Sequence, residues 1–250
     1  MIRVSFALFA LLAPLPAHAY LVKNTSMGAS VHWGDRKINF TVNALGDAAR
    51  DKALFDAAKL AAAPWGGTGE IQIEIARPSN KAKVGFVDNK TDNVIAWTDG
   101  EWEGNDDDLA LTFLHYNAQT GEILDADIVM NDVDHAWSDA LKDPVPATFD
   151  TANVLTHEMG HAIGLDHSTI AASTMYPSSA ALETIKRDLA DDDRQALASI
   201  YKGTATATAP EELAQANGKG GCQSTPIGAP GLALISVGLA WARVRRSNIR

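Results

Sequence analysis

The sequence predicts an α+β fold, and three observations support that prediction. Short runs of β-branched or alternating apolar residues, typical of strands, recur through the first half of the chain. One long stretch with a helical apolar stripe interrupts them. A second helical stretch, which is rich in histidine, follows the last of these strands. The 250 residues have an ordinary globular composition, so we expect one main domain with shorter flanking segments.

The first strand is expected at residues 38–42, where β-branched and aromatic side chains precede Asn43. Residues 48–63 are expected to form a helix that ends at Pro64-Trp65-Gly66-Gly67. Its apolar stripe would consist of Leu54, Phe55, Ala58, Ala61 and Ala62. Later elements are strands at 70–76, 93–98, 109–116 and 123–130, then a helix at 151–163 with Asp150 as N-cap. The core face of the last strand would hold Leu124, Ala126, Ile128 and Met130.

The segment from His157 to His167 has the pattern H-E-x-x-H-x-x-G-x-x-H. His157 and His161 lie one helical turn apart and face the same way, so both can bind a single metal ion. Gly164 can adopt a left-handed conformation, end the helix and bring His167 back as a third ligand. Three histidines with one open position are the ligand set of a catalytic zinc site, because a structural site fills its fourth position with protein.

Glu158 is the candidate general base of this site. It stands beside the first ligand, where its carboxylate can accept a proton from a water molecule at the open position. The alternative for the whole segment is a buried helix whose histidines are hydrogen bonded within the core. The additional G-x-x-H makes that alternative the weaker one, because a chance match would have to fix more positions.

Residues 155–177 resemble the matrixin branch of the metzincin metallopeptidases. Ser168 follows the third histidine, and Ser173-Thr174-Met175-Tyr176-Pro177 is similar to the matrixin Met-turn. The resemblance implies a metzincin-type zincin fold: a twisted mixed five-stranded sheet with three helices, in which the active-site helix precedes the Met-turn and a C-terminal helix. It also implies a zinc endopeptidase that acts on protein or peptide substrates, with Met175 as an apolar floor under the three imidazoles.

Other segments extend this resemblance. Residues 122–131 are similar to the edge strand that pairs with the extended substrate in the family. Residues 189–201 resemble the C-terminal helix, in which Asp192 and Asp193 match an acid that can pair with a freed N-terminal amine. The alternative role for this acidic run is helix N-capping by Asp191 or Asp192. The wall of the substrate pocket would come from the stretch after the Met-turn.

The sequence offers candidate ligands for two metal sites besides the catalytic zinc. Calcium takes oxygen ligands and could bind an acidic cluster, although no EF-hand-like loop is present and exposed acidic loops are common. The cluster consists of Asp106, Asp107, Asp108, Asp125, Asp127, Asp132 and Asp134. A second, structural zinc, as in some matrixins, could involve His32, His115 and His135. The matching matrixin segment is absent, so we expect these histidines to be ordinary surface or core residues.

The two ends of the chain have the features of export signals. Residues 1–19 combine a positive n-region, an apolar run and an A-x-A site, as in a secretory signal peptide. We expect a catalytic domain at 20–203, a flexible linker at 204–220 and a sorting or membrane tail at 221–250. The tail, with Cys222, an apolar run and a basic end, resembles C-terminal sorting signals of Gram-negative bacteria, especially the myxobacterial type. A plain membrane anchor is the alternative, and both place the protein outside the cytoplasm, secreted or at the cell surface.

Charge and cysteine content narrow the range of partners. The formal net charge is −10, and removal of residues 1–19 and 223–250, which hold five arginines and no acid, leaves −15. Such a chain disfavours nucleic acid and anionic membranes as partners. Cys222 is the only cysteine, so we expect no internal disulfide and no N-terminal cysteine of the kind that keeps animal matrixins latent. We expect a monomer that could associate with a membrane transiently or through its C-terminal tail.

The function expected from these observations is hydrolysis of internal peptide bonds in proteins, and two alternatives stay open. One is a metzincin of another branch. Tyr176 argues against it, because branches with a tyrosine ligand carry that tyrosine two residues after the methionine, whereas Tyr176 follows Met175 directly. The other is a catalytically silent, zinc-bearing surface or adhesion protein. Retention of Glu158 argues against it, since a silent site would not need that carboxylate.

Overall fold

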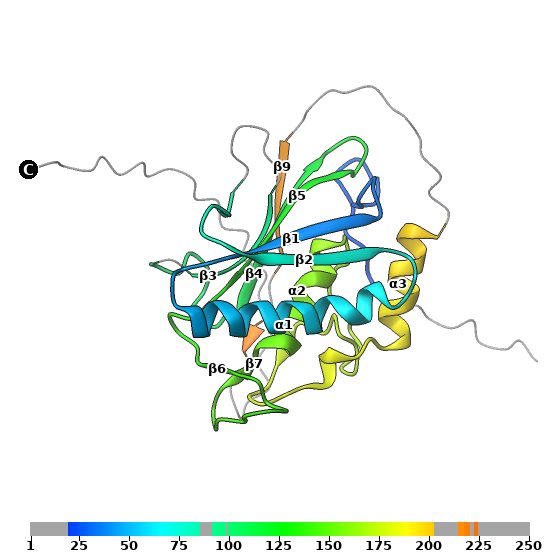
Figure 1. Cartoon of the computed structure of the whole chain (residues 1–250). Helices are drawn as coiled ribbons and strands as arrows, with labels where there is room; N and C mark the ends of the chain where they lie inside the picture. The colour runs from blue at the N-terminus through cyan, green and yellow to red at the C-terminus, as the bar shows by residue number, and fades with distance from the viewer. Residues whose placement is uncertain (1–19, 86–91, 99, 203–214, 221–222, 225–250) are drawn as a thin grey trace, which may run out of the picture.

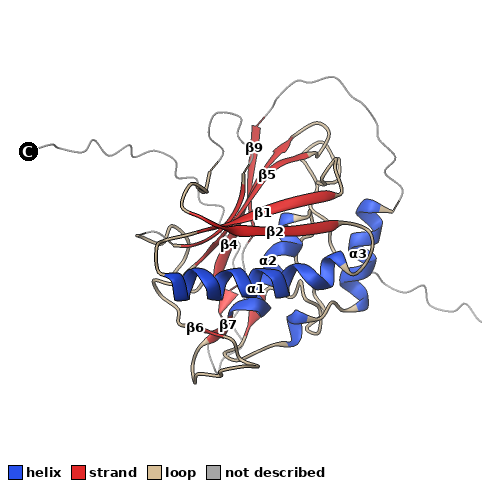
Figure 2. Ribbon diagram, viewed as in Figure 1, coloured by secondary structure: helices blue, strands red, loops and turns tan. Residues whose placement is uncertain are grey.

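The computed structural model describes residues 20–85, 92–98, 100–202, 215–220 and 223–224. Within them the protein has two layers, a twisted sheet and a set of helices that lie together on one of its sides (Figures 1 and 2). The expected signal peptide, Cys222 and the apolar and basic parts of the tail lie outside the described residues. None of the helices in this described part is long and apolar enough to cross a membrane.

The main sheet is mixed, as the sequence predicts. Its strands from the main domain are β1 (Lys37–Asn43), β2 (Gln72–Ser79), β3 (Asn93–Trp97), β4 (Ala110–Asn117) and β5 (Ile123–Met130). Their spatial order is β2-β1-β3-β5-β4, and every neighbouring pair is parallel except β5 with β4. A sixth strand, β9 (Gln215–Gly220), pairs antiparallel with the outer side of β4. Part of the segment expected to be a linker therefore lies in the sheet.

Within the main domain the outer strand is β4, so the expectation that residues 122–131 form the edge strand is wrong. β5 lies between β3 and β4, pairing parallel with the first and antiparallel with the second. A tight turn after Asn117 joins β4 to β5, with Gly121 at a φ of 79°. One side of β5 is taken by β3, so the other strand of this hairpin can lie only on the outer side.

The core face of β5 differs from the predicted one at Leu124. His115 pairs with Asp125 and Tyr116 with Ile123, so the register shifts at Leu124. A one-residue shift of this kind moves the neighbouring side chains to the opposite face. Ile123 is consequently buried and Leu124 only half-buried, whereas the rest of the predicted face is fully buried, namely Ala126, Ile128 and Met130.

The first helix, α1 (Ala48–Gly66), continues one turn beyond its predicted end. Pro64 lies inside this last turn, and the next residue, Trp65, is fully buried. The indole Nε1 of Trp65 donates to the carbonyl of Thr156 at 2.9 Å. Burial of this large, hydrogen-bonded side chain offsets the helix-breaking tendency of proline. The helix lies along β2 in Figure 1.

Two further helices complete the helical layer, so the three predicted helices are confirmed. They are α2 (Thr151–Ala162) and α3 (Asp191–Tyr201), with the 3₁₀ turn η1 (Ile185–Arg187) between them. The short strands β6 (Trp137–Ser138) and β7 (Phe149–Asp150) pair with each other, as do β8 (Ser178–Ser179) and β10 (Gln223–Ser224). Apolar side chains from the sheet and the helices form one main core.

Candidate metal centre

Helix α2 begins at the predicted cap. The carboxylate of Asp150 accepts the backbone N–H of Asn153 at 2.7 Å. It also accepts two hydrogen bonds from the guanidinium of Arg187, from Nε at 2.8 Å and from Nη2 at 2.5 Å. Asp150 is buried, and a buried carboxylate with this set of partners is well satisfied. The start of the helix is therefore firmly anchored to η1.

Helix α2 ends at Ala162, and the predicted Gly164 follows the C-cap residue Ile163. Gly164 has a φ of 96°, and a Cβ at this position would lie 2.1 Å from the carbonyl oxygen of Val31. The N–H of Leu165 donates back to the carbonyl of Gly160 at 3.0 Å, which is the pattern of a Schellman motif. Both the conformation and the close approach of backbone require glycine at this position.

The loop that carries His167 is held by the N-terminal segment. Val22 forms an isolated β-bridge with Leu165, and the N–H of Asp166 donates to the carbonyl of Leu21 at 2.9 Å. These contacts fix the loop between the end of α2 and the third histidine. They join parts of the chain that are far apart in sequence, so no local pattern could indicate them.

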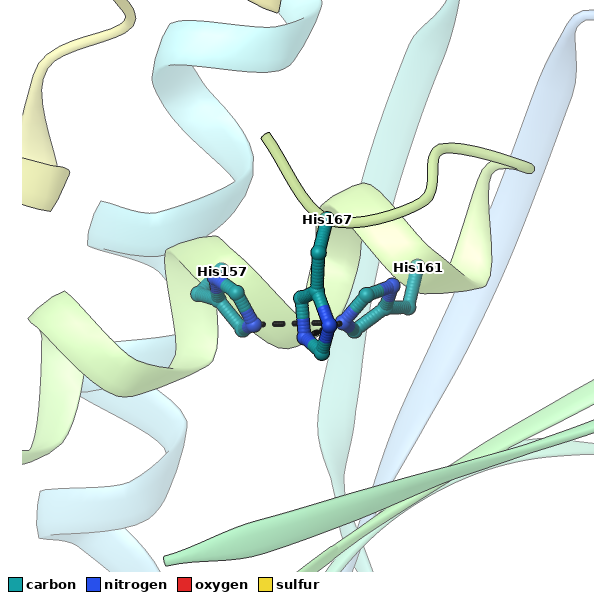
Figure 3. Close-up of side chains that lie close together, drawn as sticks. All are labelled: His157, His161 and His167. Carbon is teal, nitrogen blue, oxygen red and sulfur yellow. Dashed lines mark hydrogen bonds between the residues drawn. The ribbon is translucent and has the colours of Figure 1, made fainter. Parts of the chain in front are cut away.

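The three predicted ligands converge. His157 and His161 come from α2, and His167 reaches them from the loop that follows (Figure 3). Nε2 of His161 lies 3.1 Å from Nε2 of His157 and 3.2 Å from Nε2 of His167. A tetrahedral zinc with Zn–N bonds of about 2.0–2.1 Å holds its nitrogens roughly 3.3 Å apart, so these separations fit zinc. In the described part of the chain, no other group of three His, Cys, Asp or Glu side chains could hold a metal ion.

Backbone carbonyls fix the tautomers of the two helical histidines. Nδ1 of His157 donates to the carbonyl of Thr174 at 2.7 Å, and Nδ1 of His161 donates to that of Leu165 at 3.0 Å. Each Nε2 therefore directs a lone pair at the other, an arrangement that a cation between them stabilises. Burial, and then the neighbouring imidazoles, lower the pKa of His157 well below its usual value and that of His161 to about 3. Both rings are neutral at physiological pH, which is the form that binds metal.

Met175, the expected floor of the site, packs directly against α2. It is buried, and a Cβ added at Gly160 would lie 2.2 Å from its Sδ. The same Cβ would lie 3.0 Å from the ring of Trp65. Gly160 therefore provides the space in which the Met-turn approaches the helix that bears two of the three ligands. Sequence reasoning did not single out Gly160, although a glycine in the middle of a helix is a feature that could have indicated this contact.

The buried carboxylate of Asp193 holds the Met-turn in place. It accepts the N–H of Thr174 at 2.8 Å, the N–H of Met175 at 3.1 Å and the hydroxyl of Ser173. It also accepts the N–H of Ala190 at 2.8 Å, across the start of α3. One carboxylate thus fixes both the turn under the histidines and the beginning of the last helix.

The capping role expected of Asp191 or Asp192 is wrong. The N-cap residue of α3 is Ala190, and Asp193 reaches back to it from inside the helix. Asp192 instead accepts the hydroxyl of Ser168 at 2.6 Å. The helix starts at Asp191, so neither of the expected residues stands at the position where a side chain could cap it. Pairing of Asp192 or Asp193 with a freed N-terminal amine stays a prediction.

Glu158 contacts the outer strand of the main domain. Its side chain is fully buried, and its Oε2 accepts a hydrogen bond from Oγ1 of Thr112 on β4 at 2.6 Å. The same hydroxyl lies 3.2 Å from the carbonyl oxygen of Glu158. Sequence reasoning missed Thr112, because a threonine in a strand is common and signals nothing by itself. The contact ties the candidate general base to the sheet.

The acids of the expected calcium cluster bind other parts of the protein. Asp127 accepts the N–H groups of Gly85 at 2.5 Å and Val94 at 2.8 Å, and Asp132 forms an ion pair with Arg50. Burial is the main cause that raises the pKa of Asp125 to about 7 and that of Asp127 to about 6. Within the described residues these acids do not form a metal-binding group, so the calcium expectation gains no support.

The three remaining candidate ligands also lie apart from any metal-binding group of the described residues. Nδ1 of His32 lies 2.8 Å from the carbonyl oxygen of Ser30, and His135 packs edge-on against Phe149. His115 lies on β4, where burial lowers its pKa. These surroundings agree with ordinary surface and core roles.

Comparison with known proteins matches this geometry to one family. The family model of matrixins matches residues 17–202. The chain is 40% identical over 73 residues to metalloendoproteinase 1 of Glycine max, 39% over 75 residues to matrix metalloproteinase-27 of Tupaia belangeri and 34% over 70 residues to matrilysin of Rattus norvegicus. These matches cover 28%, 30% and 28% of this chain, and 24%, 14% and 25% of the three relatives.

The matched part of this chain therefore spans about a quarter or less of the length of these relatives. The family model, in contrast, extends over most of the chain and includes every element from β1 to α3. It also includes the converging histidines and the Met-turn below them. On this evidence the protein belongs to the matrixin family.

Proposed function

We propose that the protein is an exported zinc endopeptidase that hydrolyses internal peptide bonds of proteins. The observation that supports this most directly is the convergence of three imidazoles, whose ligand atoms all lie within 4.8 Å of one another. His157, His161 and His167 would hold the ion through Nε2. Zinc, when bound, supplies a Lewis acid that polarises a carbonyl group and lowers the pKa of a water molecule.

Glu158 would move the proton in this reaction. Its carboxylate accepts a proton from the attacking water and delivers it to the leaving amine, as a general base and then a general acid. The hydroxyl of Thr112, 2.6 Å from Oε2, orients the carboxylate for this task. Substrate would add as an extended strand along β4, the outer strand of the main domain, and not along residues 122–131.

Replacement of Glu158 by glutamine tests the proposed function. The amide keeps the size of the side chain but cannot accept the proton, so hydrolysis should fall by at least about 10²-fold. Zinc content should stay at one per chain, because Glu158 is not a ligand. The assay is turnover of casein and of a peptide substrate, with and without a chelator, at equal zinc occupancy. Activity of Glu158→Gln within threefold of wild type would refute the role.

The same assay judges the catalytically silent alternative. If the wild-type chain binds one zinc but cleaves neither substrate, and the chelator changes nothing, a zinc-bearing surface or adhesion protein is favoured. If wild type cleaves both and the chelator abolishes cleavage, that alternative is excluded. Another metzincin branch is tested by Tyr176→Phe, which should keep wild-type zinc affinity if the hydroxyl is not a ligand.

Export from a Gram-negative bacterium, with a C-terminal sorting tail, is the second part of the proposal. It is supported by the signal-peptide pattern of residues 1–19 and by the tail after Gly220. The mature chain should begin at Tyr20, and the tail beyond Cys222 should be trimmed or held in a membrane. Mass spectrometry of the native protein decides this. A soluble form with both Met1 and Arg250 would contradict it.

A further inference from the structure

Two short strands from beyond α3 lie on either side of the active-site helix. β9 pairs antiparallel with β4, with Gly220 opposite Thr112. β10 pairs parallel with β8, with Gln223 opposite Ser178. Both strands are orange in Figure 1, and together they contain all the described residues after the end of α3 and Lys202.

The two partner strands both contact α2. On one side, Thr112 of β4 donates to the carboxylate of Glu158 at 2.6 Å. On the other side, Ser179 of β8 accepts a hydrogen bond from Nδ2 of Asn153 at 2.9 Å. Asn153 and Glu158 lie on successive turns of α2, and His157 stands between them. β4 and β8 therefore form two rims that flank the turn bearing His157 and Glu158.

The chain passes from one rim to the other within a very short stretch. β9 ends at Gly220 on the first rim, and β10 begins at Gln223 on the second. Three Cα–Cα steps of 3.8 Å separate these two residues, so their Cα atoms are at most about 11 Å apart. β9 therefore ends, and β10 begins, near the turn of α2 that bears the candidate general base.

The two pairings also give this segment a direction. A chain that runs antiparallel to β4 and parallel to β8 can cross α2 in only one sense. A peptide substrate that pairs with the same backbone groups would lie in the same place and run in the same sense. Since one side of a strand can pair with only one partner at a time, the segment and the substrate exclude each other.

We propose that β9, together with β10 in the chain whose tail has not been trimmed, is a tethered competitor, a part of the chain that occupies the place of the substrate and limits access to the metal centre. This inference rests on the proposed function, because it assumes that substrate adds to β4. The occupant belongs to the same chain, so the degree of inhibition does not depend on protein concentration. It follows the domain in sequence and needs no N-terminal cysteine.

The pairing of β9 with β4 is expected to be weak and reversible. The sequence of β9 is QANGKG, with two glycines and without β-branched or aromatic residues. Glycine and asparagine have low strand propensity, and glycine and alanine have little side chain to pack. The pairing of β9 with β4 therefore contributes little free energy. Only residues 202–214 join it to α3, and a short tether gives an effective concentration of the order of millimolar. We therefore expect a rise in apparent KM of about 3- to 30-fold, without complete loss of activity.

Proline substitution in β9 tests the proposal in the zinc-loaded full chain. Adjacent residues of a strand direct their N–H groups to opposite sides, so Asn217→Pro with Gly218→Pro removes a donor to β4 whichever side each faces. The matched control is Thr206→Pro with Ala207→Pro, which adds two prolines to the segment between α3 and β9. The first readout is residue-resolved amide hydrogen exchange of β4, and the second is KM and kcat for a peptide substrate.

In the β9 variant, every second amide of β4 should exchange at least threefold faster, while the alternate amides, which face β5, keep their protection. KM should fall at least threefold and kcat should change by less than twofold. The control should match wild type in both readouts. Unchanged exchange in the β9 variant, or faster exchange with the same KM, would overturn the proposal.

The exchange readout separates this inference from the proposed function. If none of the three proteins hydrolyses the peptide, the proposed function fails, and competition with substrate fails with it, even when exchange shows that β9 pairs with β4. If all three hydrolyse it with equal KM and equal exchange, the proposed function stands and the tethered competitor does not.

Discussion

Replacing Thr112 by valine removes one hydrogen bond from the proposed general base and little else. Thr112 is fully buried, and its Oγ1 donates to Oε2 of Glu158 at 2.6 Å. Valine has nearly the same shape as threonine but carries a methyl group in place of the hydroxyl. The carboxylate of Glu158 therefore stays in a buried site and loses the donor that orients it.

The size of the effect follows from this contact. A hydrogen bond to a charged group contributes about 1.5–3 kcal/mol. If all of this is lost in the transition state, kcat/KM falls by roughly 10- to 150-fold, because 1.36 kcal/mol corresponds to a factor of ten. The loss should appear mainly in kcat, since the carboxylate acts in the chemical step and Thr112 does not hold the metal. Stability should also fall by about 1–3 kcal/mol, because the buried carboxylate loses a hydrogen bond.

The assay compares the wild-type chain with Thr112→Val and Thr112→Ser. Serine keeps the hydroxyl and loses only the methyl group, so it is the matched control. Each protein is brought to equal zinc content, and kcat and KM are measured for one peptide substrate. Urea denaturation at the same pH confirms that every protein is folded under the assay conditions.

Two results would refute the reasoning about Thr112. One is a kcat for Thr112→Val within twofold of wild type, since even a hydrogen bond of about 1.5 kcal/mol corresponds to about tenfold. The other is a Thr112→Ser variant as impaired as Thr112→Val, because the methyl group and not the hydroxyl would then be responsible. A loss of zinc from Thr112→Val alone would also show that the effect passes through the metal centre.

Three further perturbations have expected outcomes. His161→Ala should lose most of the zinc in elemental analysis, because it removes the ligand that lies next to both others, and full retention would exclude His161 as a ligand. Gly160→Ala places a Cβ 2.2 Å from Sδ of Met175, so urea denaturation should show that the free energy of unfolding falls by about 1–3 kcal/mol. Wild-type stability of this variant would show that the Met-turn can move away from the added methyl group without cost. Burial raises the pKa of Asp125 from 3.8 to about 7, so the folded state holds a proton that the unfolded chain releases at lower pH, and its contribution to stability is lost as pH rises through this window. Asp125→Asn should therefore be more stable than wild type at pH 8 but not at pH 3. An equal difference in stability between the two proteins at both pH values would contradict the raised pKa of Asp125.

The local parts of the fold and of the metal centre were predictable from the sequence. The helix of His157 and His161 follows from spacing, and its two ends follow from Asp150 and Gly164, because caps and left-handed glycines act within a few residues. The strands likewise follow from short-range alternation of apolar side chains. The ligand set was therefore predictable down to His167, which lies only five residues beyond the helix end.

The residues that support this site from elsewhere in the chain could be identified only in the folded structure. Thr112 reaches Glu158 from a strand, Asp193 holds the Met-turn from the last helix, and Leu21 fixes the loop before His167. Each of these is a common residue in an ordinary local pattern. Their roles depend on contacts between segments far apart in sequence, and no spacing within one segment encodes such contacts.

Which strand lies at the outer side of the main domain also depends on contacts between segments that are far apart in sequence. Alternation marks both β4 and β5 as strands, but it does not say which of two hairpin strands turns outward. That choice was made by the pairing of β5 with β3, and it left the outer side of β4 open to the strand from beyond α3. Composition indicated a linker for residues 204–220, because that segment is rich in alanine, threonine and proline. Backbone hydrogen bonds do not require particular side chains, so an available sheet edge can pair with a segment whose sequence has little strand propensity of its own.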